Sequence, residues 1–151
     1  MSFSKAIVAG DHYAVNLAQK VAELLSEKGL DVENVGSKSA DQKLSLQEMI
    51  PRITKNVSDE VTGVLICGTG VGVEVGANRF KGVRASLCTN AITAEDARKY
   101  DKANVLCLSA WQTEDPEQII EAWLATEYDG NESRLKMFEA FDEWAGENLS
   151  R

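Results

Sequence analysis

The sequence has few of the residues that build metal centres, disulfide scaffolds or membrane spans. It contains one histidine and three cysteines, and no two cysteines stand in a CxxC spacing, so a structural zinc site is not expected. The cysteines are odd in number and each ends an apolar run, which is typical of free thiols in a reducing compartment. No stretch approaches the ~18 apolar residues of a membrane span, and the first residues hold no signal-peptide pattern. We therefore expect a cytoplasmic protein, away from membranes, that uses neither a metal ion nor a cofactor.

Basic residues are also too few for a nucleic-acid partner. Lys and Arg number 16 against 24 Asp and Glu, and the net charge of −8 disfavours binding to a phosphate backbone. A phosphorylated small molecule is still compatible with this charge, because one local group of donors can hold a single phosphate. With 151 residues, 44% of them hydrophobic and only two prolines, the chain has the size and composition of one globular domain over residues 1–151.

Short apolar runs alternate with helical patterns along the chain. The expected strands cover residues 5–10, 31–36, 61–67, 82–88 and 103–109. The expected helices cover 15–29, 46–57, 93–100, about 115–126 and about 132–148, with Pro51 in the first turn of the second helix. This alternation predicts an α/β protein with a parallel sheet flanked by helices.

Residues 65–78, LICGTGVGVEVGAN, lie where an apolar strand ends and a glycine-rich loop begins. In open α/β sheets, ligands bind at the carboxyl ends of the strands. A nucleotide-binding turn is a weak interpretation, because Val73 stands at the third glycine of GxGxxG and no Gly-Lys-Ser/Thr follows. A tightly packed turn and a catalytic pocket with a thiol at its lip are the two alternatives.

The catalytic interpretation depends on Cys67 and the residues after it. Gly68, Thr69, Gly70 and Gly72 expose backbone N–H groups at the start of a helix, where the helix dipole favours an anion. A thiolate there can remove a proton from carbon while the N–H groups hold the oxyanion that develops. Alternatively, Cys67 is a small buried hydrophobe, and its position alone leaves both interpretations open.

Several motifs extend beyond this loop: LICGTGVG followed by AN, then KGVRASLC and ARKYDKANVLCL, and GDH after the first strand. Together they resemble the type B ribose-5-phosphate isomerase and galactose-6-phosphate isomerase family, from about residue 6 to residue 141. The resemblance implies a Rossmann-like, three-layer α/β/α fold with a five-stranded parallel sheet. It also implies a homodimer or tetramer with active sites at the subunit interface, and a C-terminal helix, about 132–148, that packs on a partner subunit.

The same resemblance implies metal-independent aldose–ketose isomerisation of a phosphorylated sugar through a cis-enediolate. By match to the family motif, Cys67 is the base that moves a proton between C1 and C2. Asp11 and His12 match the Asp-His pair that contacts the sugar and its phosphate end, and Asn78 and Arg84 match structural supports. The expected anion hole consists of four loop residues, Gly68, Thr69, Gly70 and Gly72.

The chain departs from the family pattern where the substrate is recognised. Family members commonly read Arg-x-His-Asn before the fifth strand, and here Arg98 is followed by Lys99, Tyr100 and Asp101. Tyr100 therefore takes the place of a histidine that helps to open the sugar ring, although a phenol is a poorer proton shuttle near neutral pH. The family's basic cluster for phosphate is reduced to Arg134 and Lys136.

These changes leave two functional interpretations. The first is an isomerase for ribose 5-phosphate or a related pentose, hexose or tetrose phosphate, with Tyr100 as a catalytic residue and with Asp101 and Arg134 binding the substrate. The second is a non-catalytic or auxiliary sugar-phosphate-binding subunit of the same fold.

Structural roles are expected for other residues. Glu74 complements the helix dipole in a first turn, and Tyr100 can alternatively cap the end of its helix. Cys88 and Cys107 are expected to be small buried hydrophobes. The three tryptophans, Trp111, Trp123 and Trp144, are expected in the core or in subunit contacts.

Overall fold

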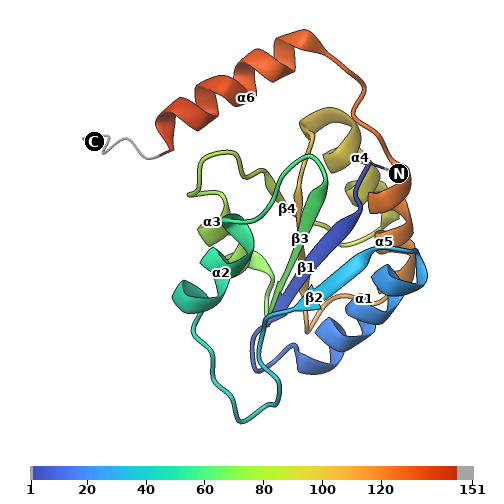
Figure 1. Cartoon of the computed structure of the whole chain (residues 1–151), viewed down its shortest axis with the longest axis vertical. Helices are drawn as coiled ribbons and strands as arrows, with labels where there is room; N and C mark the ends of the chain where they lie inside the picture. Colours follow the sequence, from blue (N-terminus) through green and yellow to red (C-terminus); the bar gives the residue numbers. More distant parts are fainter. Residues whose placement is uncertain (1, 146–151) are drawn as a thin grey trace.

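The computed structural model describes residues 2–145, and its five strands form one sheet in which every pairing is parallel (Figure 1). The strands are β1 (Lys5–Gly10), β2 (Asp31–Asn34), β3 (Val61–Cys67), β4 (Ala85–Leu87) and β5 (Val105–Ser109), in the order β2-β1-β3-β5-β4. The helices are α1 (Val15–Glu27), α2 (Leu46–Thr54), α3 (Val71–Ala77), α4 (Ala91–Asp101), α5 (Pro116–Ala125) and α6 (Glu132–Trp144). The expected α/β fold with a five-stranded parallel sheet is confirmed.

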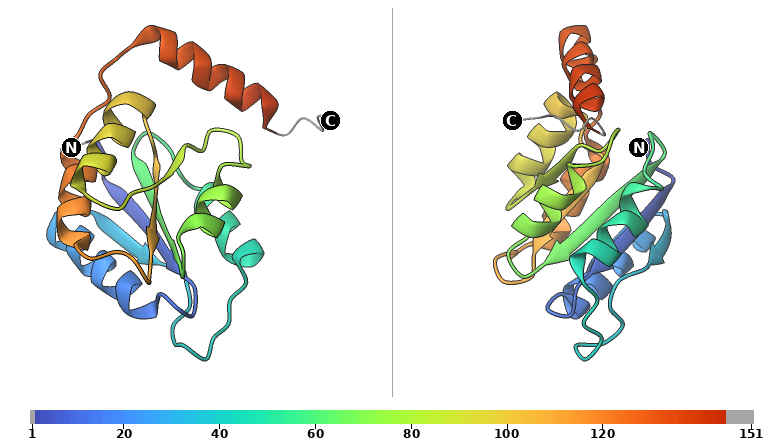
Figure 2. Two further views of the ribbon diagram at one scale, coloured as in Figure 1. Left: turned by 180° about the vertical axis from the view of Figure 1, so that it is seen from behind. Right: turned by 90° about the vertical axis from the view of Figure 1, so that its left-hand side faces the viewer.

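Helices cover both faces of the sheet, which gives the expected three layers (Figure 2). Helices α1, α4 and α5 contribute to the apolar core on one face, and α2 and α3 contribute to the core on the other. The central strand β3 lies between these cores, and all of its residues after Val61 are buried. Each large apolar side chain in these layers contributes roughly 1.5–3 kcal/mol by leaving water, so the two cores hold the sheet in place.

Helix α6 lies apart from the two covering layers, at the side of the sheet where the strands begin (Figure 2). We call that side the amino edge and the opposite side, where the strands end, the carboxyl edge. Phe138 is buried against the body, with the Arg84 guanidinium 5.4 Å from its ring, and Asp142 accepts a hydrogen bond from the Gly82 N–H at 2.7 Å. The expected helix ran to about 148, and its last part lies outside the described residues.

Several bounds of the expected secondary structure are wrong. Strands β4 and β5 begin at Ala85 and Val105, not at 82 and 103, and helices α2 and α4 cover Leu46–Thr54 and Ala91–Asp101, not 46–57 and 93–100. Strands β2 and β4 are shorter than expected and end before residues 35 and 88. Pro51 lies in the second turn of α2, because Ser45 caps the helix by accepting the Glu48 N–H at 3.3 Å and the helix begins at Leu46. A proline there removes the N–H that would bond to the carbonyl of Gln47, and the helix tolerates this loss because Gln47 is exposed to water.

Candidate active site

The carboxyl edge brings together three loops that follow neighbouring strands. Gly10 of β1 lies beside Ile66 of β3, and Cys67 of β3 lies beside Ser109 of β5. The Asp11 N–H continues the ladder by donating to the Ile66 carbonyl at 3.0 Å. The glycine loop is therefore flanked by Asp11 and the residues after it on one side, and by the loop after β5 on the other.

Cys67 is held at the start of the glycine loop by a backbone donor. The residue is 5% exposed, and its Sγ accepts a hydrogen bond from the Gly70 N–H at 3.2 Å. Gly70 has a φ of +77°, and a Cβ there would lie 2.6 Å from Leu87 Cδ1 and 3.0 Å from the Leu108 backbone. Only glycine adopts this conformation without strain, so the residue type at position 70 sets the direction of the N–H toward sulfur. The sulfur is therefore in contact with a backbone donor whose position is fixed by the glycine.

Neighbouring side chains lie close to the backbone of the loop. A Cβ on Gly72 would lie 4.0 Å from the Cys67 Sγ and 2.9 Å from Leu46 Cδ1, and a Cβ on Gly68 would lie 2.5 Å from the Trp111 ring. The Thr69 hydroxyl accepts the N–H of Val71, the first residue of α3, at 3.1 Å. The expected anion-hole residues are thus adjacent to the sulfur, with bare backbone between them.

Ser109 fixes the loop from the neighbouring strand, and the sequence analysis assigned it no role. Its buried hydroxyl donates to the Gly68 carbonyl at 2.7 Å and accepts the N–H groups of Trp111 and Gln112 at 3.2 and 3.0 Å. The Ala110 N–H also donates to the Cys67 carbonyl at 2.9 Å. The only sequence signal for this role was the place of Ser109 at the end of a strand. These bonds fix the backbone around Cys67.

Asp11 and His12 lie beside the loop, at the end of β1. Asp11 is nearly buried, and this burial raises the pKa of its carboxyl group, although the Tyr13 N–H at 3.0 Å and the nearby His12 act in the opposite direction. His12 is half-buried, and its Nδ1 is buried without a hydrogen-bond partner within residues 2–145. The rings of His12 and Tyr13 are 4.1 Å apart, and the rings of Tyr13 and Trp111 are 5.4 Å apart. A row of rings therefore borders the glycine loop.

The remaining expected site residues lie at the amino edge, far from the thiol. Tyr100 and Asp101 end helix α4, and the Arg134 guanidinium lies 5.4 Å from the Tyr100 ring. Strand β5 follows α4 closely, and its last residue, Ser109, pairs with Cys67. From Val105 to Ser109 the strand takes four steps of about 3.3 Å. Cys67 is therefore separated from Tyr100, Asp101 and Arg134 by roughly 13 Å along the sheet. One chain therefore does not bring Tyr100, Asp101 and Arg134 to Cys67.

Arg134 is already engaged at the amino edge. Its guanidinium forms an ion pair and a hydrogen bond with Asp129, and its ring-face contact with Tyr100 holds it on the outer side of α4. The Asn131 N–H and the Arg134 guanidinium lower the pKa of the Asp129 carboxyl. A phosphate that binds to Arg134 therefore competes with this carboxylate.

The expected structural supports are confirmed. The Asn78 side chain accepts the Ala85 N–H at 2.8 Å and donates to the Ala85 carbonyl at 2.9 Å. The Arg84 Nε donates to the Lys102 carbonyl at 2.9 Å. Glu74 lies in the first turn of α3, as expected, and also accepts the Leu87 N–H at 3.0 Å.

The other cysteines and the tryptophans divide as core and surface residues. Cys88 and Cys107 are fully buried, which raises the pKa of both thiols, as expected for small core hydrophobes. Trp123 is also in the core, and its indole N–H donates to the Thr62 hydroxyl at 3.0 Å. Trp111 and Trp144 are 60% and 56% exposed, so a core position for these two is wrong.

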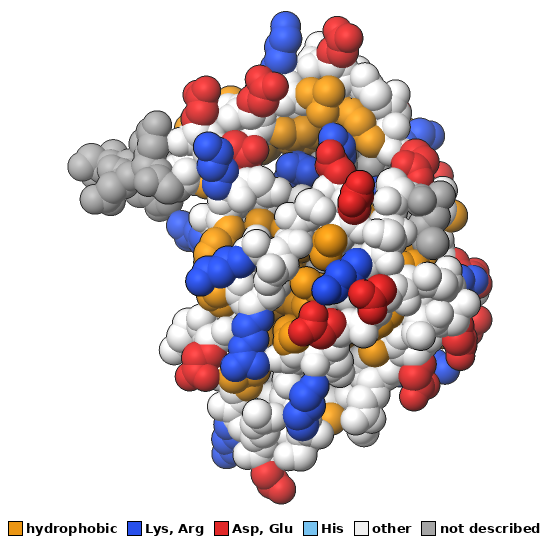
Figure 3. Space-filling model, viewed as in Figure 1, with side chains coloured by type: hydrophobic (Ala, Val, Ile, Leu, Met, Phe, Trp, Pro, Cys, Tyr) orange, Lys and Arg blue, Asp and Glu red, His pale blue; other side chains and the backbone are white. Residues whose placement is uncertain are grey.

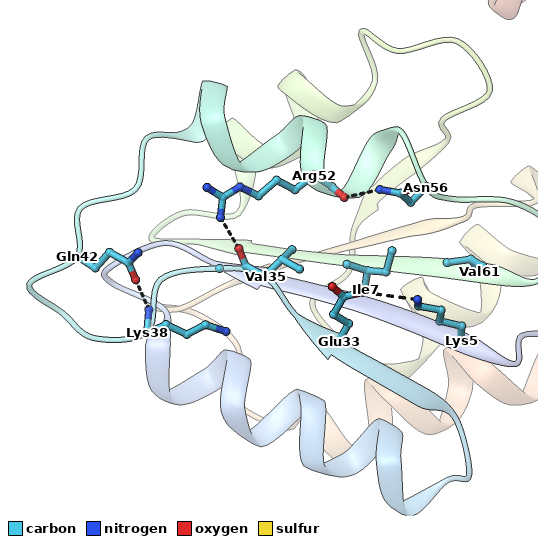
Figure 4. Close-up of a pocket in the computed structure, with 10 residues that line it drawn as sticks. Lys5, Ile7, Glu33, Val35, Lys38, Gln42, Arg52, Asn56 and Val61 are labelled. Atoms are coloured by element: carbon cyan, nitrogen blue, oxygen red, sulfur yellow. Dashed lines mark hydrogen bonds and ion pairs between the residues drawn. The ribbon is translucent and has the colours of Figure 1, made fainter.

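A separate hollow of about 770 Å³ opens between α2 and the first two strands (Figure 4). Basic side chains gather around exposed apolar ones on this face of the molecule (Figure 3). Arg52 donates to the Val35 carbonyl at 2.8 Å, and Lys5 pairs with Glu33 at 3.5 Å. No residue of the glycine loop or of positions 11–13 lines this hollow, so it is separate from the site around Cys67.

The fold and its relatives define an isomerase of the Rossmann-like α/β class. The chain belongs to the Ribose/Galactose Isomerase family, whose model matches residues 6–138, so the resemblance noted from the motifs is confirmed. A probable ribose-5-phosphate isomerase B from Mycoplasma genitalium is 36% identical over 91% of this chain and 93% of its own. Ribose-5-phosphate isomerase B from Escherichia coli is 30% identical over 84% of this chain and 87% of its own.

Solved structures agree with this assignment. The Mycoplasma genitalium ribose-5-phosphate isomerase B with bound ribulose-5-phosphate superposes with a TM-score of 0.85 at 33% identity, over 98% of this chain and 99% of the other. The Anaplasma phagocytophilum ribose 5-phosphate isomerase B gives a TM-score of 0.88 at 26% identity, over 93% and 98% of the two chains. The family is one of aldose–ketose isomerases that act on sugar phosphates.

Proposed function

We propose that this protein is a metal-independent aldose–ketose isomerase that uses Cys67 as its base and a cis-enediolate as its intermediate. The observation that carries the proposal is the hydrogen bond of 3.2 Å from the Gly70 N–H to the Cys67 Sγ, in a loop without side chains at positions 68, 70 and 72. The substrate is ribose 5-phosphate or a related pentose, hexose or tetrose phosphate. The family relationship supports the sugar-phosphate part of this assignment.

The reaction moves one proton between two carbons. The Cys67 thiolate takes the proton from C2 of the aldose, and the electrons of that C–H bond form the C1–C2 double bond of the enediolate. Backbone N–H groups of the glycine loop and the Thr69 hydroxyl hold the oxygen atom on which charge develops. The thiol then returns the proton to C1, while a proton moves between the two oxygen atoms, and the ketose results.

We propose that the site is completed by a second copy of the chain, in a homodimer or tetramer. Tyr100, Asp101 and Arg134 lie about 13 Å along the sheet from Cys67, so a partner's amino edge is needed to bring the same groups to the thiol. Tyr100 then donates to the sugar ring oxygen, Asp101 binds a hydroxyl and Arg134 holds the phosphate.

Apolar side chains are available for such an interface at both ends of the molecule. Tyr13, Val71 and Trp111 are exposed at the carboxyl edge, and the exposed Phe141 and Trp144 lie on α6. We therefore propose that α6 packs on the partner subunit. A patch of this kind on a soluble chain is typical of a protein–protein contact.

We place the reaction in the cytoplasm. The three cysteines are free and buried, as is typical of a reducing compartment. Within residues 2–145, each helix is too short or too polar to cross a bilayer.

Solvent exchange tests the proposal. The purified protein is incubated in deuterated water with a panel of pentose, hexose and tetrose phosphates, and deuterium at C2 is measured by NMR. Exchange that survives a chelator supports metal-independent proton transfer. Cys67→Ser is expected to lower turnover by roughly 10²–10⁴-fold with little change in KM, and wild-type turnover in that variant would rule out Cys67 as the base.

An auxiliary sugar-phosphate-binding subunit is the second candidate. The ion pair between Arg134 and Asp129 favours it, because it occupies a cation that a substrate phosphate needs. Binding of sugar phosphates without deuterium exchange across the whole panel would support this candidate over the isomerase.

A further inference from the structure

A small, partly open cavity lies at the amino edge, and none of the residues proposed for the isomerase reaction lines it. Its volume is about 220 Å³, and its charged lining consists of Arg84, Arg98 and Lys102 with Asp59 and Glu127. Neither Cys67 nor the Tyr100, Asp101 and Arg134 group lines it. We call it the amino-edge cavity.

A tight turn draws its three cations together. Lys102 ends helix α4 with a φ of +49°, a left-handed conformation that is uncommon outside glycine. The Lys102 carbonyl accepts the Arg84 Nε at 2.9 Å, and the next carbonyl, that of Ala103, accepts the Arg98 Nη1 at 2.5 Å. Because consecutive Cα atoms are about 3.8 Å apart, the two guanidiniums are held close to each other.

Burial leaves these guanidiniums with neutral partners. Arg98 is 5% exposed, and it contacts the Ala103 carbonyl, the Ser2 hydroxyl at 3.4 Å and the Phe3 ring at 4.4 Å. Its Nε is buried without a hydrogen-bond partner within residues 2–145. In the same part of the chain, neither Arg84 nor Arg98 forms an ion pair within 4.0 Å.

The electrostatics of the cavity follow from this arrangement. Burial lowers the pKa of both guanidiniums, and the charge of Arg84 lowers the pKa of Arg98 further. Asp142 and Asp59 act in the opposite direction on Arg84, and Glu127 and Asp59 do so on Arg98. Lys102 pairs with Asp59 at 3.7 Å on the exposed rim. Three cations thus have three carboxylates near them, of which Asp142 does not line the cavity, and the two most buried charges are both positive.

We propose that the amino-edge cavity binds a small tetrahedral oxyanion of the phosphate class. Such an anion would accept a hydrogen bond from the buried Arg98 Nε–H, which has no partner within residues 2–145, through the planar, paired geometry that arginine forms with phosphate. The volume is below the roughly 300–1,000 Å³ of pockets for drug-sized ligands, so inorganic phosphate fits and a nucleotide does not. This site is additional to the isomerase centre and does not depend on the reaction proposed above.

Titration of the intact protein with inorganic phosphate at low ionic strength tests this site. The readout is the ¹⁵N–¹H resonance of the Arg98 Nε–H, the unpartnered group, together with calorimetry. Lys102→Met, at the rim, is expected to weaken phosphate binding by roughly fivefold, the upper range for a partly exposed ion pair. Asp59→Asn is expected to strengthen it by a similar factor, since it removes a competing carboxylate. Neither variant touches the arginines, so both keep the contacts that hold the turn.

Arg134→Met is the control, because it removes the proposed substrate-phosphate contact and affects the amino-edge cavity only through the packing of Arg134 on the ring of Tyr128, 6.0 Å away. The Arg98 Nε–H should still shift on titration of this variant. The proposal is overturned if phosphate does not shift this resonance in the wild-type protein. It is also overturned if Arg134→Met abolishes the shift while Lys102→Met retains full affinity, because the anion then binds at the proposed substrate site.

Discussion

Gly70→Ala tests whether the glycine loop is held against the sheet as tightly as its geometry indicates. The native φ of +77° strains any residue with a Cβ, which costs about 1–2 kcal/mol. The new Cβ would also lie 2.6 Å from Leu87 Cδ1 and 3.0 Å from the Leu108 carbonyl group. Overpacking of this kind costs a further ~1–3 kcal/mol, because the Leu108 backbone cannot move aside as a side chain does. The expected loss in the free energy of unfolding is therefore about 2–5 kcal/mol.

Gly82→Ala is a matched control for this variant. Gly82 has nearly the same φ, +78°, but a Cβ there would meet no atom within 4 Å. Its substitution should therefore cost only the conformational part, about 1–2 kcal/mol. Urea unfolding of the two variants measures the difference directly. In a thermal scan, 1–3 kcal/mol of additional destabilisation corresponds to a Tm lower by about 2–12 °C for a chain of this size.

The two variants should also separate in activity. Gly70→Ala displaces the N–H that donates to the Cys67 Sγ, so the sulfur loses its backbone donor and turnover should fall below that of the wild-type protein. Gly82→Ala leaves the glycine loop unchanged and should retain wild-type turnover. Equal unfolding free energies for the two variants would refute the argument, because they would mean that position 70 has room for a side chain.

Three further predictions concern the buried Thr62 hydroxyl, the Asp11 carboxyl group and the proposed phosphate contact of Arg134. Thr62→Val should lower the free energy of unfolding by about 2–4 kcal/mol, because the buried Trp123 N–H and Asn104 carbonyl both lose their partner, and Thr62→Ser should restore most of it in urea unfolding. Burial raises the pKa of Asp11 above its ordinary value of 3.8. Its favourable contribution to the free energy of unfolding is therefore present below pH 3.8 and is lost as the pH rises through the folded-state pKa. The stability of Asp11→Asn relative to wild type should therefore increase with pH over that range, and a constant difference in unfolding free energy would contradict this. Asp129→Asn frees Arg134 and should lower KM for a sugar phosphate by a few fold with little change in kcat, and an unchanged KM would exclude Arg134 as a phosphate contact.

The sequence predicted most of the fold because its periodicity is clear. The apolar run before Cys67 is a strand buried on both faces, and the helical pattern from Val15 ends within two residues of Gly29. The predicted ends of helices and strands were wrong where local contacts in the folded chain decide them. Pro51 was expected in a first turn, but the cap at Ser45 sets where the helix begins, and the proline falls one turn later.

The candidate site was only partly predictable. Cys67 and Asp11 could be placed together, because parallel strands end at one edge and loops after neighbouring strands meet there. The hydroxyl of Ser109 could not be assigned from the sequence, since its bond to the Gly68 carbonyl joins residues that are 41 positions apart. Asp129 and Arg134 are only five positions apart, and their pairing depends on the local course of the chain just before α6.

The placement of the two residue groups at opposite edges of one sheet has a genetic consequence. Under the two-chain site proposed above, each active centre takes its thiol from one subunit and its amino-edge residues from another. The activity of a mixed dimer of two inactive chains then depends on where each chain is changed. One chain changed at Cys67 and one at Arg134 give a different result from two chains changed at the same edge. Mixed dimers of the first kind contain one centre with both lesions and one with neither, so two individually defective alleles can complement each other in one cell.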